Sequence, residues 1–211
     1  HWNTTARLGK LMSKVFDLGR ASEVWIMPDL EGGVHAGELE ESTDEYAVSI
    51  AASLAQRYLN AELPVGLIAY GAERYYLPAE TGNAQLNRIL RYLAVSKAEG
   101  ETPLNIAVER EEPLWGHQSS LVVITPSPSE DWVVALRELA RRGVKVVVGL
   151  VDGPSFGGLL NTLDAVEPLY RAGIPSYVVK KGDDMAVALS RRNDAVGSSA
   201  RNEKEEDGQK A

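Results

Sequence analysis

The sequence predicts one α/β domain built around a mainly parallel β-sheet with helices on both faces. Short runs of apolar and β-branched residues alternate with amphipathic helical segments, which is the pattern of successive βαβ units. No repeat and no linker-like stretch interrupts residues 22–190, so one sheet with right-handed crossovers is expected there. We place the domain at residues 22–191.

Six apolar runs are expected to form the strands, at residues 23–29, 64–70, 75–77, 121–125, 144–151 and 174–179. The longest, at 144–151, has the length of a buried strand and is far shorter than the roughly 18 residues that a membrane helix needs. Residues 75–77 follow a turn at Gly71, so they are expected to form a short antiparallel strand at the edge of the sheet.

The helices are expected where capping residues precede an apolar stripe. Ser42 and Glu45 have the spacing of a capping box, ahead of a helix that carries apolar residues on one face. Ser129 is expected to cap another helix. The first turn of that helix carries acidic residues, which the positive end of the helix dipole stabilises. Further helices are expected around residues 86–93, after Thr102 as an N-cap, at 159–172 before Gly173, and from Asp183 or Asp184 to Leu189.

The composition excludes several classes of function. Hydrophobic residues make up 44% of the 211 residues and charged residues 25%, which suits a chain with a packed core. The net charge of −8 opposes broad binding to nucleic acid. The chain has no cysteine, which excludes disulfides, thiolate zinc sites and cysteine nucleophiles, and suits a reducing compartment.

The two ends of the chain are expected to lie outside the domain. Residues 1–21 are interpreted as an N-terminal arm that ends a larger upstream region, because the chain opens on His1 without a methionine. Residues 192–211 are polar and have nothing to bury, so they are expected to form a disordered tail.

Polar side chains gather where the predicted strands end. In open α/β sheets, ligands bind outside the carboxyl ends of the strands. The residues expected at that rim are Asp29, Glu31, Gly32, Gly33, His35, Thr102, Thr125 and Asp152, with His35 expected to be exposed to solvent. Carboxylates and hydroxyls are the ligands that a hard cation such as Mg²⁺ takes, so a cation site has to be considered.

Several segments, taken in order, carry a family resemblance. They are the opening His-Trp-Asn-Thr-Thr-Ala-Arg-Leu-Gly-Lys-Leu-Met with Phe16, the first strand ending at Asp29, Val-Gly-Leu-Ile-Ala-Tyr-Gly at 65–71, Gln-Leu at 85–86 with Ile-Leu at 89–90, and Gly-Glu-Thr-Pro-Leu at 100–104. Over most of its length the chain thus resembles the bacterial family labelled domain of unknown function 58, in which the His-Trp segment precedes a von Willebrand factor A-like domain.

The resemblance implies a Rossmann-like, six-stranded von Willebrand A-type sheet and a role in binding proteins, not in catalysis. Members of the family often have membrane segments upstream, so a cytoplasmic domain is expected, tethered to the membrane if an upstream region spans it. Members are commonly encoded beside MoxR-type AAA+ ATPases, which implies such an ATPase as the partner in a chaperone-like or assembly role.

The chain departs from the metal-binding pattern of von Willebrand A domains. That pattern has Asp-x-Ser-x-Ser after the first strand, a threonine in a later loop and an aspartate after the fourth strand. Asp29 and Thr102 fit two of these positions, but Glu31 and Gly33 stand at the serine positions and Pro126 follows the later strand. We expect that no metal is bound; the alternative is a working Mg²⁺ or Mn²⁺ site at Asp29, Glu31 and Thr102 that a partner's carboxylate completes.

A second alternative is a serine hydrolase. Gly153-Pro154-Ser155-Phe156-Gly157 matches the Gly-x-Ser-x-Gly of a nucleophile elbow between a strand and a helix. Such hydrolases place the catalytic histidine after the serine in the chain, whereas all three histidines here precede Ser155. The interpretation we favour is a non-catalytic protein-contact module that uses the rim, where acidic charge steers a basic partner.

Overall fold

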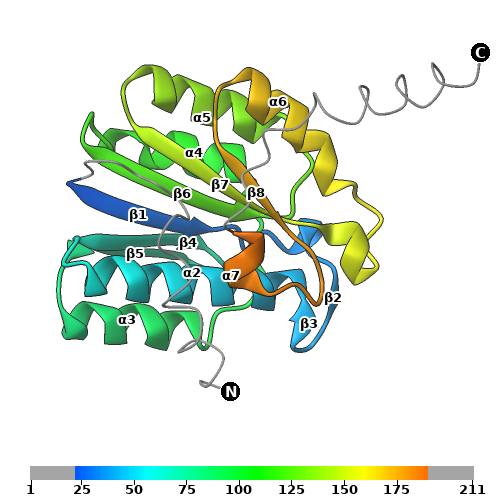
Figure 1. The fold of residues 1–211 in the computed structure, drawn as a ribbon, viewed down its shortest axis with the longest axis horizontal. Helices are drawn as coiled ribbons and strands as arrows, with labels where there is room; N and C mark the ends of the chain where they lie inside the picture. Colours follow the sequence, from blue (N-terminus) through cyan, green and yellow to red (C-terminus); the bar gives the residue numbers. More distant parts are fainter. Residues whose placement is uncertain (1–21, 190–211) are drawn as a thin grey trace, which may run out of the picture.

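A computed structural model describes residues 22–189 and confirms the predicted architecture (Figure 1). Six strands form one sheet in the order β5-β4-β1-β6-β7-β8. Only β5 runs antiparallel to its neighbour, β4; the other pairs are parallel. The strands are β1 (Glu23–Pro28), β4 (Val65–Tyr70), β5 (Arg74–Glu80), β6 (Ser119–Thr125), β7 (Lys145–Val151) and β8 (Ser176–Val179).

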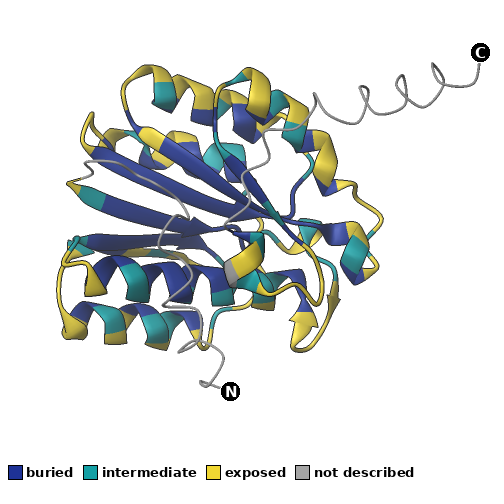
Figure 2. Cartoon of the chain, in the orientation of Figure 1, coloured by how far each residue is buried: buried dark blue, intermediate teal, exposed yellow. Residues whose placement is uncertain are grey.

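Helices cover both faces of this sheet. One face carries α2 (Thr43–Asn60), α3 (Asn83–Leu93) and α7 (Met185–Ala188), and the other carries α4 (Leu104–Glu111), α5 (Asp131–Arg141) and α6 (Val166–Arg171) (Figure 1). Successive side chains of β1 alternate between the two resulting cores. Val24 and Ile26 pack in one, and Trp25 and Met27 in the other. Apart from Glu23 at the start of β1, the strands β1, β4 and β6 are therefore buried along their length (Figure 2), and this explains why their sequences read as apolar runs.

Two of the predicted helix starts are confirmed by side-chain bonds. The Ser42 hydroxyl accepts the N–H of Glu45 at 3.4 Å, at the start of α2. At the last helix, Asp184 accepts the N–H of Val187 at 3.3 Å. Ser129 accepts the N–H of Asp131 at 3.2 Å ahead of α5, although the backbone places Glu130 in the N-cap position.

The prediction that Thr102 caps α4 is wrong. The helix begins at Leu104, and Pro103 stands in the N-cap position with φ −59° and ψ 145°, which is extended and not helical. Proline at that position offers no side-chain acceptor, so α4 begins without a side-chain cap.

The helix predicted at 159–172 begins later than expected. After β7 the chain forms a short 3₁₀ turn, η4 (Gly153–Phe156), then a left-handed turn at Gly157 and a second 3₁₀ turn, η5 (Thr162–Ala165), before α6. Gly158 packs so closely on Ala36 that a Cβ atom there would lie 2.8 Å from the Ala36 side chain. This tertiary contact overrides the local helical pattern.

Other short elements were not predicted. The unpredicted elements are the antiparallel pair β2 (Gly37–Glu38) and β3 (Glu41–Ser42) and the 3₁₀ turns η2 (Gly32–Val34) and η3 (Glu112–Leu114). The arm predicted at 1–21 and the tail predicted at 192–211 lie outside the described residues. Within the described part of the chain, no helix is long and apolar enough to cross a bilayer.

Gly100 fixes the loop that leaves β1. Its N–H donates to the Leu30 carbonyl at 2.8 Å, and its carbonyl accepts the N–H of Gly32 at 2.9 Å. A Cβ atom at this position would lie 2.1 Å from the carbonyl oxygen of Tyr70 and 2.8 Å from that of Leu30. Only glycine allows the two segments to approach this closely.

Replacing Gly100 with alanine is therefore expected to lower the free energy of unfolding by about 2–3 kcal/mol, because two backbone carbonyls would have to move. Gly33→Ala is the matched control, since a Cβ there meets no atom within 4 Å; it should stay within about 0.5 kcal/mol of the unmodified chain. Urea denaturation measures both variants. Equal stability of the two would contradict the close packing of Gly100.

Candidate functional site

Asp29 lies at the end of β1 and is buried, with 4% of its surface exposed. Its Oδ1 accepts the backbone N–H of Glu31 at 3.1 Å, and its Oδ2 accepts the hydroxyl of Thr125 at 2.6 Å. Thr125 is the last residue of the neighbouring strand β6 and is itself fully buried. The Asp29 carboxylate thus joins the ends of two central strands and fixes the first turn of the loop that follows.

Burial raises the pKa of Asp29 from its ordinary value of 3.8 to about 6. The hydrogen bonds from Thr125 and from the Glu31 N–H act in the opposite direction, because they stabilise the charged form. Desolvation prevails since both oxygens lie in the protein interior and no cationic side chain contributes to the balance.

His35 is half-buried and bonded at both ring nitrogens, so the prediction that it is exposed is wrong. Its Nε2 lies 3.0 Å from the carbonyl oxygen of Asp29, and because a carbonyl only accepts, Nε2 carries the proton. Nδ1 is then the acceptor for the Thr43 hydroxyl at 2.9 Å, and the oxygen of that hydroxyl accepts the N–H of Ala36 at 2.9 Å. Burial lowers the pKa of His35, in agreement with a neutral ring.

Asp152 follows β7 and is also buried. Its backbone oxygen accepts both the hydroxyl and the N–H of Ser155, at 2.7 and 3.0 Å. Its Oδ1 has no hydrogen-bond partner in the described part of the chain. Burial raises the pKa of Asp152, and the charge of Lys180 opposes that rise.

Thr162 was missed by the sequence analysis, yet it organises the loop after β7. Its buried hydroxyl oxygen lies 2.8 Å from the Pro126 carbonyl and 3.2 Å from the Val151 carbonyl, and it accepts the N–H of Gly153 at 2.9 Å. Thr43, which holds His35, was missed in the same way. Neither threonine belongs to a local motif, so only the folded structure identifies their roles.

The predicted rim therefore divides into two groups. Asp29, Thr125 and His35 are joined by hydrogen bonds and form an internal brace, and Asp152 is buried without joining it. Gly32 and Gly33 are exposed, and Glu31 and Thr102 are partly exposed, so these four are the accessible rim. The bridge between Glu31 and Gly100 brings the segment before Thr102 alongside the β1 loop.

The site offers few oxygen atoms to a cation. Both Asp29 oxygens already accept hydrogen bonds, and the Thr125 hydroxyl is committed to Asp29 and to the N–H of Ser127 at 2.9 Å. Across residues 22–189, no three His, Asp or Glu side chains are grouped so that they could hold a metal ion.

Ser155 is not placed as a nucleophile. Its hydroxyl donates to the Asp152 carbonyl at 2.7 Å and accepts the N–H of Lys181 at 2.9 Å. His35, the histidine of this loop region, has both nitrogens engaged by Thr43 and Asp29. The serine therefore joins two loops, and no base is bonded to it among the described residues.

The raised pKa of Asp29 predicts a specific pH dependence of stability. The folded state binds this proton more tightly than the unfolded state, so stability is greatest below about pH 4 and falls by about 3 kcal/mol as the pH rises through about 6. Asp29→Asn removes the ionisation and should remove this pH dependence. Urea denaturation between about pH 4 and pH 8 measures the difference between the two proteins.

A second variant tests whether ionisation of the buried Asp29 causes this pH dependence of stability. Thr125→Val removes a bond that lowers the Asp29 pKa, so the fall in stability should move to higher pH. A difference between the unmodified chain and Asp29→Asn that is the same at every pH would contradict a buried, proton-binding Asp29.

The fold is similar to those of several solved structures. BatB from Bacteroides thetaiotaomicron superposes with a TM-score of 0.60 at 18% identity, covering 81% of this chain and 96% of BatB. The SpRpn10 VWA domain gives 0.53 at 12% identity, covering 81% and 92%. The manganese-loaded Plasmodium vivax TRAP protein gives 0.51 at 13% identity, covering 82% and 72%. At these identities the likeness shows a von Willebrand A-like fold.

Comparison of sequences gives the family. The uncharacterized protein YeaD of Bacillus subtilis is 26% identical over 149 residues, which cover 70% of this chain and 35% of YeaD. The chain thus spans about a third of the length of that relative. The model of the family described as "Protein of unknown function DUF58" matches residues 1–155, most of the chain. This protein therefore belongs to the DUF58 family, and residues 22–189 have the von Willebrand A-like fold that the sequence predicts.

Proposed function

We propose that this domain is a non-catalytic module that binds a protein partner through the accessible rim at the carboxyl ends of its strands. Von Willebrand A-like domains form a family of protein-interaction modules, and the geometry fits that role. The observation that carries the proposal is the internal brace. Hydrogen bonds within the protein occupy the polar groups of Asp29, Thr125 and His35, so the rim presents a fixed shape and partly exposed acid to a partner.

The proposed binding mode does not use a metal ion. In the TRAP structure manganese is bound, whereas here each Asp29 oxygen already accepts a hydrogen bond, from the Glu31 N–H or the Thr125 hydroxyl, which reduces what the carboxylate can offer a cation. Glu31 and Gly33 replace serine hydroxyls, and Pro126 has no side-chain oxygen. Octahedral Mg²⁺ needs several well-placed oxygen ligands, and this set falls short.

The absence of a catalytic role is part of the same proposal. Ser155 bonds to backbone groups on either side of its loop, which supports a structural role for the Gly-x-Ser-x-Gly segment. A serine without a base is a weak nucleophile.

The partner we propose is a MoxR-type AAA+ ATPase, in a chaperone-like or assembly function. Its support is the family resemblance together with the net charge of −8, which would attract a basic patch on the ATPase. Glu31 is the acid of the accessible rim, so it is the residue through which this attraction would act.

Calorimetric titration of the purified domain with a MoxR-type AAA+ ATPase from the same organism tests this proposal. Glu31→Lys is expected to weaken binding about tenfold, because it places a positive charge against a basic surface. Glu109→Lys, on the exposed side of α4, is the control for net charge and should bind almost normally. Absence of binding would reject the ATPase as the partner. Equal binding by the two variants would reject the rim as the contact surface. Asp29 is unsuitable for charge reversal, because its burial would confound folding with binding.

A further inference from the structure

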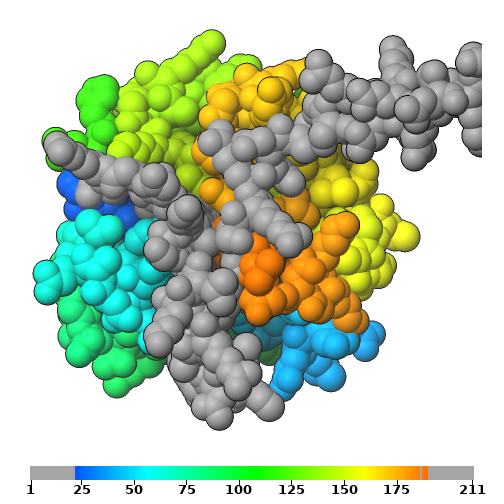
Figure 3. Space-filling model, viewed as in Figure 1, coloured from blue at the N-terminus to red at the C-terminus, as the bar shows by residue number. Residues whose placement is uncertain are grey.

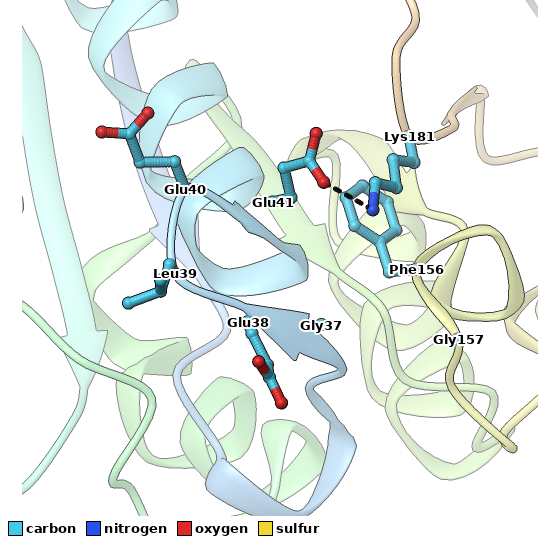
Figure 4. A pocket seen from close by; sticks show the side chains of 8 residues that line it. All are labelled: Gly37, Glu38, Leu39, Glu40, Glu41, Phe156, Gly157 and Lys181. Atoms are coloured by element: carbon cyan, nitrogen blue, oxygen red, sulfur yellow. Dashed lines mark ion pairs between the residues drawn. The ribbon is translucent and has the colours of Figure 1, made fainter.

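A groove that the sequence did not predict lies beside the accessible rim. It has a volume of about 870 Å³. One wall is the β2–β3 hairpin, and the other comes from the turn after β7 and the loop before α7 (Figure 4). In Figure 3 the hairpin, in blue, and these two loops, in yellow and orange, lie together at one end of the molecule. The lining residues are Gly37, Glu38, Leu39, Glu40, Glu41, Phe156, Gly157 and Lys181.

The walls of the groove are held in place by packing beneath them. Tyr46 of α2 meets the ring of Phe156 edge to face, with centroids 4.7 Å apart. The Tyr46 hydroxyl also accepts the N–H of Gly182 at 3.0 Å. The base of the hairpin touches the opposite loop where Gly158 packs on Ala36. A partner would therefore meet a surface that is already formed.

Exposed leucines occur on the hairpin and just beyond the opposite wall in the chain. Leu39, at the hairpin tip, is 87% exposed, and Leu159, in the loop beyond Gly157, is fully exposed. Leu160 beside it is 43% exposed. Leu39 lines the groove, and Leu159 and Leu160 follow its lining residue Gly157 in the chain, so exposed apolar side chains are available to a partner on or close to the groove.

The groove lining is mainly acidic. Glu38, Glu40 and Glu41 line the groove, and Lys181, the one cation among its described lining residues, is paired with Glu41 at 2.7 Å. Partial burial raises the pKa of the neighbouring Glu45, and repulsion from Asp44 and Glu40 raises it further. Because Lys181 is paired with Glu41, the other two glutamates of the groove, Glu38 and Glu40, have no ion-pair partner in the described part of the chain.

We propose that this groove binds a basic amphipathic segment of a partner protein. An apolar anchor of the segment would cover Leu39, and its Arg or Lys side chains would face Glu38 and Glu40. The acidic lining repels phosphate backbones and anionic lipid, so the complementary surface is that of a protein. This inference rests on the proposed function, because it specifies which surface and which partner chemistry that function uses.

A phage-displayed library of random dodecapeptides, selected against the whole chain, provides the probe. The selected peptides are expected to combine Arg or Lys with Leu, Ile, Met or Phe. Their binding to purified variants is then measured by fluorescence anisotropy. Leu39→Asn should weaken it about fivefold or more, and Glu38→Lys with Glu40→Lys should weaken it further.

Leu39→Asn separates binding from folding. Leu39 has a φ of 51°, in the left-handed region that asparagine adopts more readily than leucine. The variant should therefore unfold at the same temperature as the unmodified chain or at a higher one, while losing the apolar tip. Val134→Ala, an exposed apolar position on α5, and Glu109→Lys are the controls, and both should bind the peptides normally.

The proposal is overturned if no basic–apolar peptides are enriched, if Leu39→Asn and the double glutamate variant bind them normally, or if Val134→Ala abolishes binding. Failure of the groove proposal can be distinguished from failure of the ATPase proposal. Selected peptides that need the groove, together with no ATPase binding, would keep the groove and reject that partner. ATPase binding that depends on Glu31 without any selected peptides would reject the groove.

Discussion

The buried hydrogen bond between Thr125 and the carboxylate of Asp29 is the interaction on which the functional end of this domain depends. It joins the ends of β1 and β6 at the centre of the sheet, and the other carboxylate oxygen fixes the first turn of the β1 loop. His35 extends the same arrangement, because it bonds both to the Asp29 carbonyl and to Thr43 at the start of α2. The β2–β3 hairpin projects from this loop, so its position follows from the brace below it.

A carboxylate used in this way is a poor candidate for a metal ligand. Both of its oxygen atoms already serve the brace, and the positions that supply further ligands in metal-binding von Willebrand A domains hold Glu31, Gly33 and Pro126 instead. In our account Asp29 has a structural role, and the partner protein contacts the accessible rim and the groove beside the β2–β3 hairpin. There the Glu38 and Glu40 carboxylates and the exposed Leu39 are free of the constraints that hold Asp29.

The sheet could be predicted from the sequence because its strands are buried on both faces and therefore read as apolar runs. The convergence of Asp29 and Thr125 could also be predicted, since parallel strands bring their carboxyl ends together. The burial of Asp29 and the pairing of His35 could not, because they depend on hydroxyls that reach the loop from other elements. The late start of α6 has a similar cause: the contact between Gly158 and Ala36 and the bonds of Thr162 outweigh a local helical pattern.

The central claim is that Asp29 is a structural acceptor and not a metal ligand. Calorimetric titration of the domain with Mn²⁺ and with Mg²⁺, at neutral pH and with unfolding temperatures recorded in parallel, tests it most directly. Our account predicts no saturable heat and no rise in unfolding temperature with either ion. Saturable binding of one ion that raises the unfolding temperature, and that Asp29→Asn abolishes, would contradict it.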